Sequence, residues 1–327
     1  MSSLAAGPLF GLPLADLWFA AVFFVLGTFL LLDGFDFGVG VLFALADDHS
    51  REQYLAAIGP FWDGNEVWLV VFGGVLFAVF PEVYASLFSR YYLLMFAILA
   101  GLGLRGLAPE MYEQRADDRW RRFWGASFVV GSTGTPFLLG VFVVNWLVGA
   151  PSVLTLPGVL GGLAVLALCV VDAVAFLGLK LPDAADTTGY GPPALAAYLA
   201  LAVALVSALY VAEPGLRGAL TSLPVLGLLA LSVALGAAYV VAIRRDTHRG
   251  AFAAVAGLVF GLVALIALVM YPTIDRGSAL TVSDAVISTL PLNLVTLMMA
   301  VFLPLVLGYF AVLYSTFSGP IETEESY

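Results

Sequence analysis

The sequence predicts an all-α polytopic membrane protein with nine transmembrane helices. Of its 327 residues, 62% are hydrophobic and 11% are charged, whereas roughly 25% of the residues in a soluble protein are charged. The charges avoid long apolar tracts such as 17–32 and 251–270, each near the length that spans a bilayer. So few charges cannot cover a water-facing surface, so most of the chain is expected to lie in lipid.

The first half of the chain contains four predicted spans. Apolar windows of about 20 residues, interrupted by proline, glycine and charge clusters, define them. Only the turn Phe80-Pro81-Glu82 separates the second span from the third, so reading Pro81 as a kink would reduce the total to eight. The four windows are 17–45, 62–80, 83–105 and 123–148.

The second half contains five further windows of the same kind. Their boundaries again coincide with prolines, glycines and charged residues. Proline and glycine within such windows are tolerated in membrane helices, so they do not indicate a low-complexity chain. These five predicted spans are 153–180, 193–213, 223–243, 251–271 and 289–316.

The distribution of Lys and Arg predicts that the N-terminus lies outside and the C-terminus in the cytoplasm. With this orientation ten of the thirteen cations fall in inner loops and only Arg90, Arg217 and Arg276 in outer loops, as short cytoplasmic loops prefer. The first 16 residues contain no Lys or Arg, unlike a cleaved secretory signal. The first span is therefore expected to be retained.

Several classes of function are excluded by composition. The single cysteine, Cys169, cannot form an internal disulfide, and the net charge of −10 argues against a nucleic acid partner. His49 and His248 both lie in polar stretches, and Met95, Met298 and Met299 cannot pair with either at one depth. We expect this chain to ligate no haem or metal ion by itself.

Acids within predicted spans mark the candidate site, because a charge in lipid is costly. Asp33 and Asp36 lie three residues apart on one face of the first helix, about 24 Å along it from the outer side. Asp63 and Glu66 begin the second helix at the same membrane face, beside Trp62. We expect Asp33, Asp36 and Asp63 to be functional before Glu66.

One cation and one further acid complete the predicted cluster. Arg105 closes the third predicted helix at the inner side, and Glu110 follows five residues later. Three successive helices thus bring ionisable groups to one membrane face, where a carboxylate cluster connected to water can take and release protons. The alternative is that these ion pairs only fix helix packing.

Three other features remain ambiguous from sequence alone. Gly34 and Gly38 have the GxxxG spacing that lets another helix approach, either within this chain or in a partner. Asp172, the deep acid of the second half, is expected to bond across helices or to line a water-filled vestibule. Aromatic residues near span ends, including Tyr91, Trp146 and Tyr271, are expected to anchor at the membrane interface.

Several segments together resemble subunit II of the cytochrome bd-type quinol oxidases. The similarity covers nearly the whole chain and is densest in residues 30–125; the two acidic motifs together are its most specific part, and MetTyrGluGln after Glu110 departs from the more basic run expected there. The matching segments are LeuAspGlyPheAspPheGlyValGly (32–40), GlyProPheTrpAspGlyAsnGluValTrpLeu (59–69), GlyGlyValLeuPheAlaValPhePro (73–81), GlyLeuArgGlyLeuAlaProGlu (103–110), and TyrPro (271–272) with SerAlaLeuThr (278–281).

The resemblance implies a nine-helix fold of two four-helix bundles, 1–150 and 151–285, followed by a ninth helix and an acidic tail, 286–327. It implies a partner, subunit I, that carries haem b and haem d, in a prokaryotic plasma membrane. The complex would oxidise quinol, reduce oxygen to water and draw protons from the cytoplasm without pumping. Asp33 or Asp36 and Asp63 match the positions assigned to proton uptake; a bound quinone or lipid and the quinone type are left open.

Two other functions compete with this interpretation. A secondary transporter would bind a cation through the same acids, but it predicts acids near the midplane and mirrored broken helices in both halves. Here the acids are one-sided in sequence and concentrated in the first half. A scaffold whose acids only pack against subunit I is harder to separate from sequence.

Overall fold

A computed structural model describes residues 7–181 and 185–320. Within these residues nine helices are long and apolar enough to cross a membrane, which confirms the predicted all-α polytopic class. They are α2 (Leu14–Phe43), α4 (Trp62–Val79), α6 (Tyr92–Glu113), α7 (Asp118–Val148), α8 (Leu156–Lys180), α10 (Gly191–Ala212), α12 (Leu223–Arg244), α13 (His248–Met270) and α15 (Thr289–Thr316).

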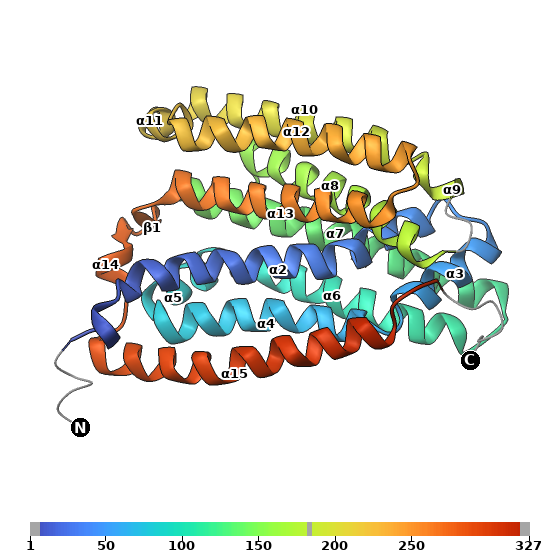
Figure 1. Cartoon of the computed structure of the whole chain (residues 1–327), viewed down its shortest axis with the longest axis horizontal. Helices are drawn as coiled ribbons and strands as arrows, with labels where there is room; N and C mark the ends of the chain where they lie inside the picture. Colours follow the sequence, from blue (N-terminus) through green and yellow to red (C-terminus); the bar gives the residue numbers. More distant parts are fainter. Residues whose placement is uncertain (1–6, 182–184, 321–327) are drawn as a thin grey trace.

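Short elements connect the long helices at the two ends of the molecule (Figure 1). At one end lie α5 (Pro81–Arg90), α11 (Arg217–Leu220), α14 (Val282–Ala285) and the antiparallel pair β1 (Thr273–Asp275) and β2 (Leu280–Thr281); at the other lie α3 (Asp48–Ile58) and α9 (Ala185–Thr188). The 3-10 turns are η1 (Leu9–Gly11) and η2 (Pro214–Leu216). We call these the outer and inner ends after the predicted orientation, which stays a prediction.

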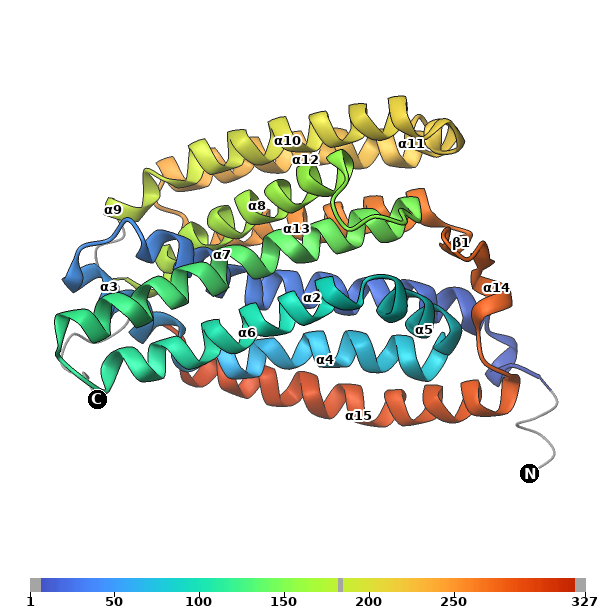
Figure 2. The ribbon, with the colours of Figure 1, turned by 180° about the vertical axis from the view of Figure 1, so that it is seen from behind.

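The long helices run side by side, with α2 at the centre (Figures 1 and 2). α2 packs against α4, α7, α8 and α13, and α8 packs against α7 and α10. In both views α10 and α12 form one outer layer, and α15 lies along the opposite side, next to α4. The division into two four-helix bundles stays a prediction.

The central α2 and α8 approach closely because of glycine. A Cβ atom on Gly38 would overlap the Cys169 carbonyl oxygen and the Ala173 side chain, and one on Gly34 would lie 3.1 Å from Asp172 Oδ2. Small residues at this spacing let two membrane helices meet backbone to backbone. The partner helix implied by the glycine spacing is therefore α8, within the same chain.

The third span differs from its prediction. The chain forms a separate short helix, α5, after Pro81, and bends at Tyr91 before the membrane helix α6 begins. Consequently α6 continues eight residues past Arg105, through Pro109, to Glu113. The prediction that Arg105 closes the third helix is wrong: Arg105 lies inside the span and is 2% exposed.

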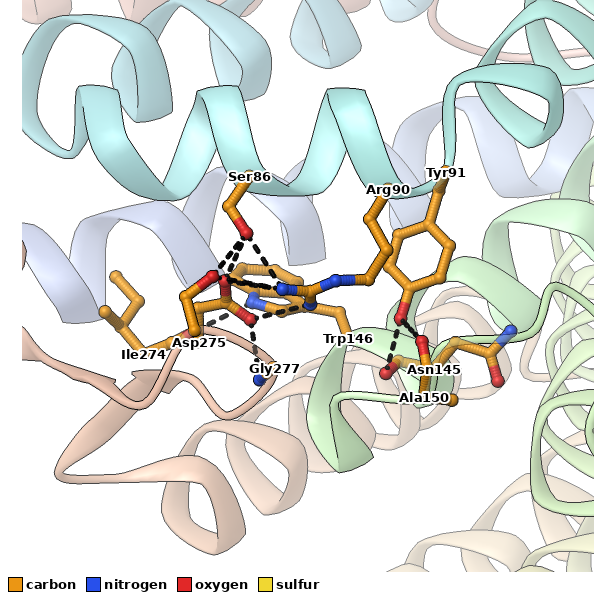
Figure 3. Close-up of polar contacts among 10 residues, drawn as sticks. Ser86, Arg90, Tyr91, Asn145, Trp146, Ala150, Ile274, Asp275 and Gly277 are labelled. Carbon is orange, nitrogen blue, oxygen red and sulfur yellow. Dashed lines mark hydrogen bonds and ion pairs between the residues drawn. The ribbon is translucent and has the colours of Figure 1, made fainter.

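A polar clamp at the outer end joins α5 to the loop after α13 (Figure 3). Arg90 Nη1 donates to Asp275 Oδ1 at 3.0 Å, and Ser86 Oγ donates to Asp275 Oδ2 at 2.6 Å. The backbone N–H of Gly277 donates to Asp275 Oδ1 at 3.1 Å, and a side chain at Gly277 would overlap the Arg90 guanidinium. The clamp holds the outer ends of distant segments together.

Two aromatic residues near this clamp are interior anchors rather than interfacial ones. Tyr91 is fully buried and its hydroxyl donates to the carbonyl oxygens of Asn145 and Ala150, at 3.0 and 2.6 Å. Trp146 is also fully buried and donates to Ile274 O at 2.7 Å (Figure 3). Interfacial anchoring was the wrong prediction for both, because their polar atoms find partners inside the fold.

The clamp predicts an acid-sensitive contribution to stability. Burial tends to raise the pKa of Asp275, but the hydrogen bonds from Arg90, Ser86 and Ser278 and the charge of Arg90 outweigh it and hold that pKa below its ordinary value of 3.8. The stabilisation is therefore complete above the ordinary pKa and is lost as the pH falls through the lower folded-state pKa. Wild type should exceed Asp275→Asn in melting temperature at neutral pH, with the gap closing only well into the acid range. A gap that stays unchanged through the acid range, or that already closes above pH 3.8, would contradict this.

Candidate functional site

The candidate site lies in the interior of the molecule, toward the inner end of α2. Asp33 and Asp36 are both 0% exposed, one turn apart on α2, whose residues around them are almost all buried. Because α2 is surrounded by four other helices, these carboxylates cannot reach water directly. They need partners from neighbouring helices.

Arg105 of α6 supplies the positive charge. Its Nη2 lies 2.8 Å from Asp33 Oδ1 as an ion pair without hydrogen-bond alignment, and Nη1 lies 3.9 Å from Asp36 Oδ2. The same Nη2 donates to Glu66 Oε2 of α4 at 3.1 Å. The guanidinium also stacks 4.7 Å from the centre of the Phe37 ring. One buried cation thus faces three carboxyl groups from two helices.

Asn65 and Tyr314 extend this cluster toward α15. The Asn65 amide nitrogen donates to Asp36 Oδ2 at 2.9 Å and to the Leu32 carbonyl oxygen at 2.8 Å. The Tyr314 hydroxyl donates to the Asn65 amide oxygen at 2.8 Å. Asn65 is fully buried, so both ends of its amide are held by hydrogen bonds. We call Asp33, Asp36, Glu66, Arg105 and Asn65 the acidic cluster.

Glu66 connects the acidic cluster to the surface. Its side chain is 31% exposed and lines a groove of about 530 Å³ between α4, α5, α6 and α7. The rest of the groove is apolar, with residues such as Phe77, Phe88 and Leu99. Glu66 is therefore the member of the cluster that a molecule lying against α4 and α6 could reach.

The other predicted site residues lie outside the cluster. Asp63 is exposed at the start of α4 and makes no hydrogen bond or ion pair with the residues that the structure describes. Trp62 packs against α6, where a Cβ on Gly106 would lie 3.1 Å from its ring. Glu110 is exposed in the last turns of α6. The expected order of Asp63 before Glu66 is thus reversed in the geometry of the cluster, because α4 turns Glu66 toward α6 and Asp63 outward.

Asp172 of α8 lies against the same part of α2. It is 0% exposed, its carboxylate faces Gly34, and neither oxygen has a hydrogen-bond partner among the described residues. The hydrogen bond across helices that was one of the two expectations for Asp172 is therefore not formed with any described residue. Although the acids are concentrated in the first half of the sequence, the fold brings an acid of the second half beside them.

Sequence analysis missed the roles of Asn65 and Tyr314. Asn65 was given no role of its own within the motif of residues 59–69, although an amide between two acidic positions requires partners when it is buried. Tyr314 lies 249 residues away from it, in the last turn of α15, and nothing local to the sequence marks it. A signal for Asn65 existed, whereas none existed for Tyr314.

The histidines and methionines considered as haem ligands lie in separate parts of the described structure. His49 lies in α3 and His248 at the start of α13, both at the inner end. Met95 lines the groove beside α6, and Met298 is 59% exposed on α15. That this chain ligates no haem by itself therefore stays a prediction.

Comparison with known proteins shows a family match over most of the chain. The profile of the family "Cytochrome bd terminal oxidase subunit II" matches residues 14–317. Cytochrome bd ubiquinol oxidase subunit 2 of Bacillus subtilis is 30% identical over 315 residues, which cover 90% of this chain and 93% of that protein.

A shorter match links the chain to proteins of other bacteria. Cytochrome bd-I ubiquinol oxidase subunit 2 of Escherichia coli K12 is 39% identical over 137 residues, 41% of this chain and 36% of that protein. The probable cytochrome oxidase subunit 2 of Haemophilus influenzae is 36% identical over the same length. These two matches span only about a third of those relatives.

Proposed function

The chain belongs to the cytochrome bd terminal oxidase subunit II family, and from this premise we propose that it is the subunit of a quinol:oxygen oxidoreductase that delivers protons. In this proposal its partner, subunit I, carries haem b and haem d, oxidises quinol and reduces oxygen to water. The complex lies in a prokaryotic plasma membrane. The present chain supports subunit I and takes up protons from the cytoplasm, so that charge is separated without pumping.

One observation carries the proton-delivery role: a single buried guanidinium, Arg105, faces three carboxyl groups, those of Asp33, Asp36 and Glu66. An uncompensated charge in a bundle interior is expensive. A cluster with more carboxyl groups than cations therefore holds exchangeable protons rather than a full set of negative charges. A purely structural ion pair would need only one acid.

The direction of transfer follows from exposure. Asp33 and Asp36 are sealed by the surrounding helices, whereas Glu66 is partly exposed and Asp63 is exposed on the same helix, α4. We assign Glu66 and Asp63 to the side that faces subunit I, and Asp33 and Asp36 to the interior of the path. The proton leaves this chain at α4, and the redox chemistry takes place in the partner.

The test of this assignment is Asp63→Asn in the assembled oxidase. This change removes a carboxyl group that makes no hydrogen bond or ion pair with the described residues, so folding should not change, while transfer toward subunit I should slow. We expect oxygen consumption per haem to fall several-fold, less than for an interior acid–base group, because Asp63 is exposed and water can partly replace its carboxyl group. Haem content and the reduced-minus-oxidised spectrum should remain those of the wild type.

Asp284→Asn is the matched control, since Asp284 is an exposed acid at the outer end that only pairs with Thr281. It should leave turnover unchanged. If Asp63→Asn also leaves turnover unchanged in a fully haem-loaded complex, Asp63 is a scaffold residue. If Asp33→Asn and Asp36→Asn also leave turnover unchanged, the proposal that this subunit delivers protons is wrong.

A further inference from the structure

A cavity at the inner end lies directly beyond the acidic cluster. It has a volume of about 640 Å³ and lies between the end of α8, the start of α13 and the end of α15. Its lining includes Lys180, His248, Arg249 and Tyr314. Tyr314 is thus shared: it lines this cavity and donates to Asn65 in the cluster.

Aromatic rings close the cavity toward the bundle interior. Phe176, which lines it, stacks on Phe35 with ring centres 3.8 Å apart, and Phe61 lies 4.7 Å from the Tyr314 ring. Among these rings only Tyr314 has a polar atom, and that atom reaches the Asn65 amide. The Tyr314 hydroxyl is therefore the polar connection through an otherwise apolar floor.

Polar contacts lead from Tyr314 toward the exit side. From Tyr314 the hydrogen bonds run to Asn65 and then to Asp36 Oδ2, which faces Arg105. Arg105 then contacts both Asp33 and Glu66. A chain of polar contacts thus links a cavity at one end of the molecule to the partly exposed Glu66 on α4.

Positively charged side chains dominate the lining of the cavity. Among the described residues Lys180 and Arg249 outnumber the single acid that lines it, Asp246, so the lining does not favour binding of a metal cation. His248 also lines it, and its Nδ1 atom is buried without a hydrogen-bond partner among the described residues.

We propose that this cavity is the entrance through which protons reach the acidic cluster, and that Tyr314 is the positioning residue that orients the Asn65 amide toward Asp36. The proposal rests on the proton-delivery function above. A proton that enters the cavity is accepted by the Asp36 carboxylate, and no bond other than the O–H bond of the carrier is broken. Without the Tyr314 hydroxyl, the Asn65 carbonyl oxygen is free to turn toward Asp36 and repel its charge.

The first test plugs the cavity in the complete oxidase. The chain has one native cysteine, Cys169, which is buried, so a thiol placed at Ser318 in the cavity wall can be modified selectively with a bulky thiol reagent. Modified S318C complex should lose most of its oxygen consumption, while the unmodified variant keeps it. S315C, on the exposed surface of α15 outside the cavity lining, is the matched control, and the unsubstituted complex controls for cysteines of the partner.

The second test removes only the hydroxyl group. Tyr314→Phe should slow both steady-state oxygen consumption and proton uptake after an oxygen pulse by about fivefold, the effect of losing one orienting hydrogen bond. Tyr309→Phe on the same helix, 59% exposed, should have no effect. Haem spectra should be unchanged in both, which separates slowed proton supply from loss of structure.

The outcomes separate this inference from the proposed function. If Asp36→Asn is slow but the plugged S318C complex and Tyr314→Phe are as fast as wild type, protons enter the cluster elsewhere and the entrance is refuted. If Asp36→Asn is also as fast as wild type, both proposals fail. If all three are slow, both are supported.

Discussion

Replacing Arg105 by methionine is expected to be the most destabilising single change in this protein. Methionine fills a similar volume but leaves Asp33, Asp36 and Glu66 without their shared cation in a site where Arg105 is 2% exposed. Removing one partner of a buried ion pair typically costs about 3–5 kcal/mol. We expect a low yield of assembled complex and a clearly lower thermal midpoint in detergent.

Charge balance predicts how this defect can be rescued. Adding Asp33→Asn to Arg105→Met removes one of the uncompensated acids, so part of the lost thermal stability should return, although turnover should not. Arg119→Met is the matched control: Arg119 is exposed in the first turn of α7, and its loss should change stability by no more than about 0.5 kcal/mol. An Arg105→Met complex as stable as the control would mean that the guanidinium does not neutralise the cluster.

The second large effect is expected on turnover rather than on stability. Asp33→Asn and Asp36→Asn are isosteric, and the Asn65 amide can still donate to a side-chain oxygen at position 36, so the fold should persist. Each change removes a group that carries a proton along the path. Losing a positioned acid–base group typically costs about 10²–10⁴ in rate, and we expect a decrease of about tenfold or more in oxygen consumption per haem.

Asp118→Asn is the control for these two variants. Asp118 is an exposed acid at the start of α7, at the same inner end, and its replacement should leave turnover unchanged. Quinol-driven oxygen consumption, normalised to haem content, is the measurement. Full activity in both Asp33→Asn and Asp36→Asn complexes would support a scaffold role for this subunit and contradict proton delivery.

The transporter alternative is addressed by the same geometry. In the sequence, the concentration of acids in the first half of the chain argued against a transporter. In the structure, however, Asp172 of α8 lies against Gly34, the α2 residue that follows Asp33. The separation in sequence does not hold in space. What argues against a cation site is the buried guanidinium of Arg105 in the middle of the acids, because it repels a transported cation.

The residues of the candidate site were predictable to different degrees. Asp33 and Asp36 could be selected because an ionisable residue inside an apolar window is costly and so stands out locally. Arg105 was selected as the cation at the predicted end of the third helix, and only the structure placed it inside α6. Glu66 was ranked below Asp63, yet the two are three residues apart on α4, and only the rotation of α4 about its axis decides which of them meets Arg105. Tyr314 could not be selected, since a tyrosine in the last turn of a membrane helix is ordinary.

The sequence by itself determined the number of membrane helices and the approximate limits of all but the third, because the length of an apolar window is a local property. It also determined that α2 carries buried acids and small residues at a close helix contact. Only the tertiary structure decided that α8 makes that contact, that Arg105 lies within α6 rather than at its end, and that Tyr314 reaches Asn65 across 249 residues. Those outcomes depend on how the helices rotate and pack against one another, which the local sequence does not specify.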